Sequence, residues 1–378
     1  LAVLAGIVAS AAPALAQTIT VDGQRDAAYG APAFVQFNTT RFGDNADPDP
    51  VLAGGSEIDA VYAHVADGRL YVLVTGNLET NFNKLVLFFD AQQGGQNRIL
   101  GGQPGPLGAM GTAGDAPGLT FESGFNADYF LSVTTGHFNN DTPDNTEDDY
   151  IAVFGDAAIL NTDGPEFDPF TGASLAYHAS DGNTAAGGLV PFDGPGFQFP
   201  EEATGFPTTQ YAPRRAAQRA AAGTAPTAAD AGLIQIAVNN SNTAGVIGTG
   251  VAEQADMEAA AAVTTGIEIS IALDELRAQG ATPVNPIRIA GWIASGDFGY
   301  LSNQVFGGTP VGYDNIGAEV QGGVRHVDFN DIPGLQYITV GQTAPEPIEI
   351  CEADLDGDNR ATVNDLLLYL GRFRAGCN

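Results

Sequence analysis

The stretch "SEIDAVYAHVADGRLYVLVTGNL", residues 56–78, decides the fold class. In its first half, Ile58, Ala60, Tyr62 and His64 alternate with their neighbours. Such alternation is typical of a strand with one buried face. Asp67-Gly68 then forms a turn signal between two apolar runs. The stretch therefore predicts a β-hairpin.

Similar short runs continue along the chain, and 49 glycines and 22 prolines interrupt them with turns. They span residues 84–90, 128–135, 149–155, 233–240, 266–273, 287–295 and 335–340. Helical patterns are short and confined to residues 213–222, 252–262 and 273–279. We therefore expect a mainly β protein, built as one large antiparallel, jelly-roll-like β-sandwich with long loops and few short helices.

Composition limits the function classes. Acidic residues number 45 against 14 basic ones, which gives a formal charge of −31. Such a field repels nucleic acid and anionic lipid, so nucleic-acid binding is excluded. The 44% of apolar residues can fill a sizeable core, so the chain is not of a disordered type.

The chain start, "LAVLAGIVASAAPALAQ", is an uncharged apolar run that ends in Ala-Leu-Ala. We interpret residues 1–16 as an N-terminally incomplete signal peptide that is cut before Gln17. A membrane anchor is the alternative, but no later run reaches the ~18 uninterrupted apolar residues that a spanning helix needs. The sequence thus predicts a secreted or cell-surface protein without a transmembrane segment in the mature chain.

The main sandwich is expected to occupy residues 17–340. Within it, residues 101–119 and 194–207 are rich in Gly, Pro or Ala and predict long surface loops or insertions. Residues 341–350, "GQTAPEPIEI", contain prolines that favour an extended linker. A separate small module, residues 351–378, follows the linker.

That module contains the motif "DLDGDNRATVND", residues 354–365. Calcium takes oxygen ligands from positions one, three, five, seven, nine and twelve of a twelve-residue loop. Those positions hold Asp354, Asp356, Asp358, Arg360, Thr362 and Asp365. Position seven donates only its backbone carbonyl, so Arg360 is acceptable there. Asn359 stands at the sharply turning position six, where glycine is usual and where Asn best tolerates a left-handed conformation. The motif predicts a calcium site.

Two further features support this module. Thr362 and Asp365 form a capping pair before the helical stretch "VNDLLLYLGRF". Cys351 and Cys377, the chain's two cysteines, bracket the loop and the helix. In an exported chain they most simply form one disulfide, although two free thiols are the alternative.

These residues give the module a family resemblance. "ADLDGDNRATVNDLLLYLGRF" resembles one repeat of a type I dockerin, and the cysteine bracket is similar to dockerin-like modules of planctomycete exported proteins. The resemblance implies a bacterial exported protein that binds calcium and attaches to a surface or matrix protein. A full dockerin has two repeats, whereas this module has one. Val363-Asn364 replace the Ser-Thr type pair frequent in cohesin-binding dockerins, so the resemblance does not specify cohesin as the partner.

A second resemblance concerns the main domain. "ITVDGQRDAAYGAPAFVQ", residues 19–36, resembles the opening of exported β-sandwich modules related to family-nine carbohydrate-binding modules, and "TTGIEISIALDELRA", residues 264–278, resembles their late strand and turn. The resemblance implies a β-sandwich, and it argues for this fold more than for glycan binding. The single Trp292 lies inside an alternating run, so we expect it in the core and not on a sugar-binding surface.

Motifs for catalysis are missing from the sequence. It contains no nucleophile elbow, zinc-protease helix, phosphate loop or dinucleotide fingerprint. The four histidines are His64, His137, His178 and His326, and they lack ligand-like spacing. A carboxylate pair for glycoside hydrolysis stays open, because the separation of two carboxylates depends on the fold. Extra calcium sites in the acidic segments 42–50, 139–150 and 161–172 also stay open.

Two functions follow from these observations. The first is a non-catalytic exported β-sandwich whose calcium-binding tail attaches it to a cell surface or matrix, with glycan binding as a further role. The second is a secreted polysaccharide-active enzyme of unfamiliar type with a dockerin-like anchor. An enzyme requires carboxylates that converge in an open cleft, whereas a binding or structural protein does not.

The calcium loop yields the first prediction. Protein freed of metal with a chelator should bind calcium in a titration calorimeter, and Asp354→Ala combined with Asp365→Ala should remove one site, because both substitutions delete carboxylate ligands. A double variant with unchanged stoichiometry would contradict the assignment.

Overall fold

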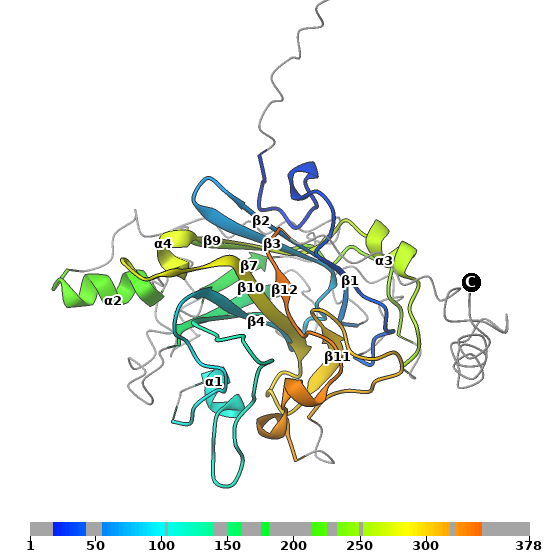
Figure 1. Cartoon of the computed structure of the whole chain (residues 1–378). Coiled ribbons are helices and arrows are strands. Elements are labelled where there is room, and N and C mark those ends of the chain that lie inside the picture. Colours follow the sequence, from blue (N-terminus) through cyan, green and yellow to red (C-terminus); the bar gives the residue numbers. More distant parts are fainter. Residues whose placement is uncertain are drawn as a thin grey trace, which may run out of the picture.

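The computed structural model describes residues 18–42, 55–102, 105–138, 150–160, 175–180, 213–224, 233–248, 252–317 and 322–341. These residues form two antiparallel sheets that pack face to face, so the expected mainly β sandwich is confirmed (Figure 1). The expected signal peptide and the module at 351–378 lie outside the described residues.

One sheet has five strands in the order β1-β2-β3-β9-β8. Its strands are β1 (Phe34–Val35), β2 (Glu57–Ala66), β3 (Arg69–Asn77), β9 (Gly266–Ala272) and β8 (Ile234–Val238). The other sheet has the order β11-β10-β4-β5-β6-β7, with β12 also paired to β10. Its strands are β11 (Leu301–Val305), β10 (Pro283–Ala294), β4 (Asn81–Gln92), β5 (Tyr129–Phe138), β6 (Tyr150–Ile159), β7 (Leu175–Ser180) and β12 (Ile338–Thr339).

The predicted hairpin is present as β2 and β3, which pair antiparallel. Its turn residues Asp67 and Gly68 have φ values of 49° and 75°. Both values lie in the left-handed region, as a two-residue turn with the twist of the flanking strands requires. The Asp-Gly signal therefore predicted the turn correctly.

The sequence predicted that Ile58, Ala60, Tyr62 and His64 share one face of the strand, but the structure interrupts this alternation within β2. The register shifts between Ile58 and Ala60, so Asp59 forms a bulge. Ile58 faces the core between the sheets, whereas Ala60 and Tyr62 pack in a separate cluster on the outer face of the five-stranded sheet. The bulge turns Asp59 toward the loop around Val246, whose N–H it accepts.

The core between the sheets comes from alternate positions of nearly every long strand. β3 contributes Leu70, Val72 and Val74, and β4 contributes Leu85, Leu87 and Phe89. All are at most 1% exposed. The aliphatic and aromatic side chains thus form one continuous apolar layer, whose burial is the dominant stabilising contribution.

A second apolar layer covers the outer face of the seven-stranded sheet. Trp292 of β10 and Phe88 of β4 pack there against Phe121, Phe125 and Phe329 from long connections. The connection with helix α1 (Gly105–Met110) and the segment after β11 lie on this same side of the sheet (Figure 1). Trp292 is fully buried, as expected.

This layer corrects the expectation of a simple surface loop at residues 101–119. Leu107, Met110 and Leu119 are at most 1% exposed and pack in the outer cluster. The segment folds over the sheet because its few large apolar residues bury there, while its glycines permit close backbone approach. At Gly118, for example, a Cβ would lie 2.3 Å from the carbonyl oxygen of Ile99.

The expected helical patterns correspond to short helices: α2 (Pro213–Ala221), α3 (Met257–Ala262) and α4 (Leu273–Leu276). Short 3-10 turns are η1 (Ala27–Tyr29), η6 (Val324–His326) and η7 (Phe329–Asp331). The expected loop at 194–207 lies outside the described residues. Within the described ranges, no helix has the length and apolar character needed to cross a membrane.

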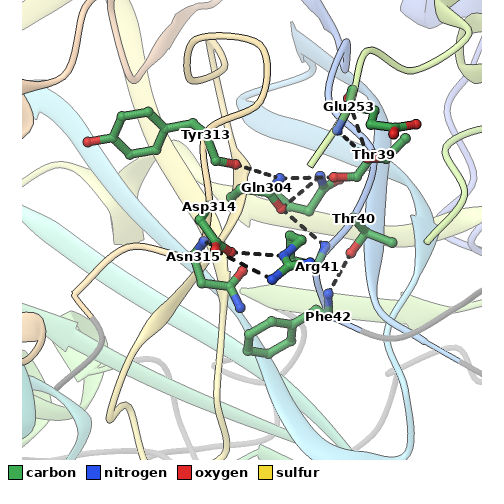
Figure 2. Close-up of polar contacts among 10 residues, drawn as sticks. Thr39, Thr40, Arg41, Phe42, Glu253, Gln304, Tyr313, Asp314 and Asn315 are labelled. Carbon is green, nitrogen blue, oxygen red and sulfur yellow. Dashed lines mark hydrogen bonds and ion pairs between the residues drawn. The ribbon is translucent and has the colours of Figure 1, made fainter. Parts of the chain in front are cut away.

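Buried amides connect the two sheets at one edge. Asn303 of β11 donates to the carbonyls of Thr39 and Tyr313, and the neighbouring Gln304 donates to the carbonyl of Asn38 and accepts the N–H of Ile58. Figure 2 shows part of this network, around Thr39, Gln304 and Tyr313, beside the Arg41–Asp314 ion pair, whose Nε–Oδ1 distance is 2.9 Å. Because Asn303 and Gln304 are fully buried, these hydrogen bonds fix the edge in one arrangement.

Candidate functional site

The predicted calcium ligands lie outside the described residues. They are Asp354, Asp356, Asp358, Arg360, Thr362 and Asp365. The cysteines Cys351 and Cys377 lie outside them as well, as does most of each acidic segment considered for further calcium. Across the described ranges, no group of three or more Asp, Glu, His or Cys side chains is arranged to hold a metal ion.

The carboxylates of the sandwich itself were the open question for catalysis. Six of them are at most 1% exposed: Glu57, Asp59, Asp90, Asp128, Glu268 and Glu275. Asp90 pairs with Arg288 and accepts the N–H of Asn126, and Glu57 accepts a side-chain N–H of Asn242. The other four, which we call the four buried carboxylates, accept main-chain N–H groups from a loop, a strand end or a helix start. Their contacts and exposure decide whether these carboxylates can take part in catalysis or only stabilise the structure.

Glu268 of β9 holds the start of the described chain. Its Oε2 accepts the N–H groups of Asp22 at 2.8 Å and Gly23 at 2.9 Å, and its Oε1 accepts the hydroxyl of Tyr29 at 2.8 Å. Burial raises the pKa of Glu268 to about 7. The segments "VDGQRDAAY" (21–29) and "GIEIS" (266–270), far apart in sequence, therefore meet at this carboxylate, and its role there is structural.

Glu275 of α4 holds the start of helix α2. It accepts the N–H groups of Arg214 at 2.7 Å and Arg215 at 2.9 Å, and the hydroxyl of Tyr129 at 2.9 Å. The first N–H groups of a helix have no partner within the helix, so this carboxylate supplies one. Burial raises the pKa of Glu275 to about 7.

Asp128 and Asp59 have the same role at other loops. Asp128 accepts the N–H groups of Ala91 and Gln92, and burial raises its pKa to about 7. Asp59 accepts the N–H of Val246 and a side-chain N–H of Asn242, and burial raises its pKa as well. A Cβ at Gly245 would lie 2.0 Å from Asp59 Oδ1, so only glycine fits beside this carboxylate.

The four buried carboxylates are thus closed to solvent, and each holds main-chain N–H groups, while Asp128 Oδ1 has no hydrogen-bond partner. A substrate could not reach them without local unfolding. A different region must be considered for ligand binding.

A cavity of about 520 Å³ lies in the loop layer over the seven-stranded sheet. Its polar lining residues are Gln96, Asn97, Arg98, Thr120, His326 and Asp328, and Leu100 and Pro117 add apolar surface. The lining comes from the connection after β4 and from the η6–η7 region, which lie far apart in sequence. The fold is therefore required to assemble this cavity.

Short β-bridges fix the cavity residues in a row. Arg98 pairs antiparallel with Thr120, and Thr120 pairs in parallel with Asp328. Hydrogen bonds flank these bridges, from Phe121 N–H to the carbonyl of Asn97 and from Thr120 N–H to the carbonyl of Val327.

The neighbours of this row face the other way. Ile99, Leu119, Phe121, Val327 and Phe329 are buried in the outer apolar cluster. Since side chains alternate between the two faces of extended segments, Arg98, Thr120 and Asp328 face outward together. The row therefore rests on a packed apolar base.

The charges on the cavity wall are mixed. Arg98 and His326 are exposed, and Asp328 is half-buried. Asp328 accepts the N–H and the side-chain N–H of Asn330. The nearby Glu122 is not part of the lining, and burial, followed by the charge of Asp328, raises its pKa. The cavity can thus donate hydrogen bonds from the guanidinium of Arg98 and accept them at the carboxylate of Asp328 and the hydroxyl of Thr120. The Asn97 amide already donates to the carbonyls of Phe121, Glu122 and Phe125.

Sequence reasoning missed most of this site. His326 was considered only as one of four isolated histidines, and Arg98, Thr120 and Asp328 follow no known motif. The signal that could have found them is alternation in "NRIL" (97–100), "LTF" (119–121) and "RHVDF" (325–329), although their pairing could not be read from it.

Comparisons of the chain with protein-family models, with curated proteins and with solved structures return no match. The class of this protein therefore rests on its fold and its cavity. It is a two-sheet antiparallel β-sandwich with a polar cavity in the loop layer over one sheet.

The raised pKa values generate a pH prediction. A carboxyl whose folded-state pKa is raised binds its proton more tightly in the folded protein than in the unfolded chain. The resulting stabilisation is full below the ordinary values of 3.8 for Asp and 4.5 for Glu and is lost as pH rises through about 7. We expect the melting temperature to fall between pH 5 and pH 8.

Glu268→Gln should flatten this pH dependence without preventing folding. The Gln oxygen can accept the two N–H groups, and its amide can donate to Tyr29 in place of a protonated carboxyl. Glu258→Gln, at an exposed position of α3, is the matched control for net charge. Melting curves from pH 5 to pH 8 test this, and an equal pH slope in Glu268→Gln and wild type would contradict it.

Proposed function

We propose that this protein is an exported, non-catalytic β-sandwich that binds a saccharide in the cavity of the loop layer, and that its C-terminal calcium-binding module attaches it to a surface or matrix partner. The observation that carries the proposal is the polar cavity lined by Arg98, Thr120, His326 and Asp328.

The size and chemistry of the cavity suit a sugar. Its volume of about 520 Å³ falls within the range of small-molecule sites. Sugar hydroxyls both donate and accept hydrogen bonds, and the lining offers groups of both kinds. Pro117 and Leu100 add apolar surface that can contact the C–H face of a ring.

Binding is favoured over hydrolysis by the distribution of carboxylates. Glycoside hydrolysis ordinarily needs two carboxyl groups that flank the scissile bond. Among the described lining residues, Asp328 is the one carboxylate, and two hydrogen bonds from Asn330 hold it as the cap of η7. The four buried carboxylates are inaccessible, so the enzyme alternative has less support.

The tail completes the proposal. The loop at 354–365 has the calcium ligand pattern, and the resemblance to dockerins supports attachment or assembly as its role. The tail would then attach an exported protein that has a formal charge of −31.

Filling the cavity tests the proposal. Leu100→Trp should weaken saccharide binding at least tenfold, because the indole takes the space of the ligand. Binding is measured by titration calorimetry against neutral and acidic mono- and disaccharides, and melting temperatures verify folding.

Leu335→Trp is the control, because Leu335 is 55% exposed and lies outside the cavity lining. Wild-type protein that binds no saccharide, or a folded Leu100→Trp variant that binds as wild type does, would overturn the proposal.

A further inference from the structure

We infer that the saccharide held in this cavity carries a carboxylate, as a uronic acid does, and that Arg98 binds that carboxylate. This inference rests on the proposed function and names the ligand class for the same cavity.

Arg98 stands apart from the other basic residues that the structure describes. Arg41 pairs with Asp314, Arg215 with Asp274 and Arg288 with Asp90. Arg25, Arg69, Lys84, Arg214, Arg277 and Arg325 donate to hydroxyls or carbonyls. In the described part of the chain, the side chain of Arg98 has no polar protein partner, although acidic residues outnumber basic ones more than threefold.

The backbone of Arg98 is nevertheless firmly placed. Its bridge to Thr120 and the buried neighbour Ile99 fix the strand, so the guanidinium starts from a defined point on the cavity wall. A guanidinium binds a carboxylate through two parallel N–H bonds, which gives both energy and orientation. A rigid base with an unpaired guanidinium is therefore suited to a carboxylate ligand.

The rest of the row fits a sugar ring beside that carboxylate. Thr120 lies next to Arg98, and Asp328 lies next to Thr120 on its other side. Cross-strand neighbours have Cβ atoms roughly 5 Å apart, so the row spans about 10 Å. Thr120 and Asp328 can accept ring hydroxyls at that separation from the guanidinium.

The charge of the cavity selects a carboxylate over a phosphate group. Asp328 and the nearby Glu122 place negative charge close to the ligand, which disfavours a dianion more than a monoanion. The overall charge of −31 also repels anions, but salt screens exposed charges beyond about 8–10 Å, whereas the bond to Arg98 acts at contact distance.

Titration calorimetry of the full chain with four sugars tests the inference: galacturonate, glucuronate, galactose and glucose. Wild-type protein should bind a uronate more tightly than its neutral counterpart. Arg98→Ala should weaken uronate binding roughly tenfold or more, the range for hydrogen bonds to charged groups, and leave neutral-sugar binding within about twofold. Arg98→Lys should retain part of the preference, because it keeps the charge but loses the planar fork.

Arg219→Ala in α2 is the control for net charge, since it removes one positive charge outside the cavity lining and should leave both affinities unchanged. Equal wild-type binding of uronate and neutral sugar would overturn this inference but leave the proposed function standing. Equal losses for both sugars in Arg98→Ala would do the same. Absence of all saccharide binding would overturn both.

Discussion

The placement of the long connections depends on buried carboxylates that accept main-chain N–H groups from the segments around the two sheets. Glu268 accepts two from residues 22 and 23, Glu275 accepts two from the start of α2, and Asp128 accepts two from the end of β4. A buried N–H without a partner costs about as much as a lost hydrogen bond, so each of these loops is stable only where its carboxylate lies. The strands thereby determine the position of the long connections as well as the core.

This constraint also explains how a loop-rich chain can form a defined cavity. β4 ends at Ala91 and Gln92, whose N–H groups Asp128 accepts, and the connection that follows continues to Arg98 on the cavity wall. Beneath the wall, Phe121, Trp292 and Phe329 pack on the seven-stranded sheet. The polar row above them is placed by backbone pairing and apolar packing together. A site built in this way can hold an unpaired guanidinium at little cost, because the backbone that carries it is already ordered.

Much of the fold follows from local sequence, and the reasons for the exceptions are physical. Alternation and the Asp-Gly turn predicted β2 and β3, because both signals act within a few residues. The bulge at Asp59 was missed because its cause is a contact with a loop near residue 245, far along the chain. The segment with α1 was expected to be a surface loop because glycine and proline dominate it, yet burial of Leu107 and Met110 overrides that composition. The cavity could not be foreseen, since its bridges join residues about 20 and 200 positions apart in sequence. The predicted calcium loop is a local signal, because its expected ligands all fall within twelve consecutive residues.

Buried carboxylates hold these segments through main-chain N–H groups, and amide hydrogen exchange measures this directly. We expect slow exchange, comparable with that of the strand amides of β3, at seven positions, most of which lie outside regular strands: Asp22, Gly23, Ala91, Gln92, Arg214, Arg215 and Val246. Exchange of these amides at the rate of exposed loop positions, such as Gly280, would contradict it.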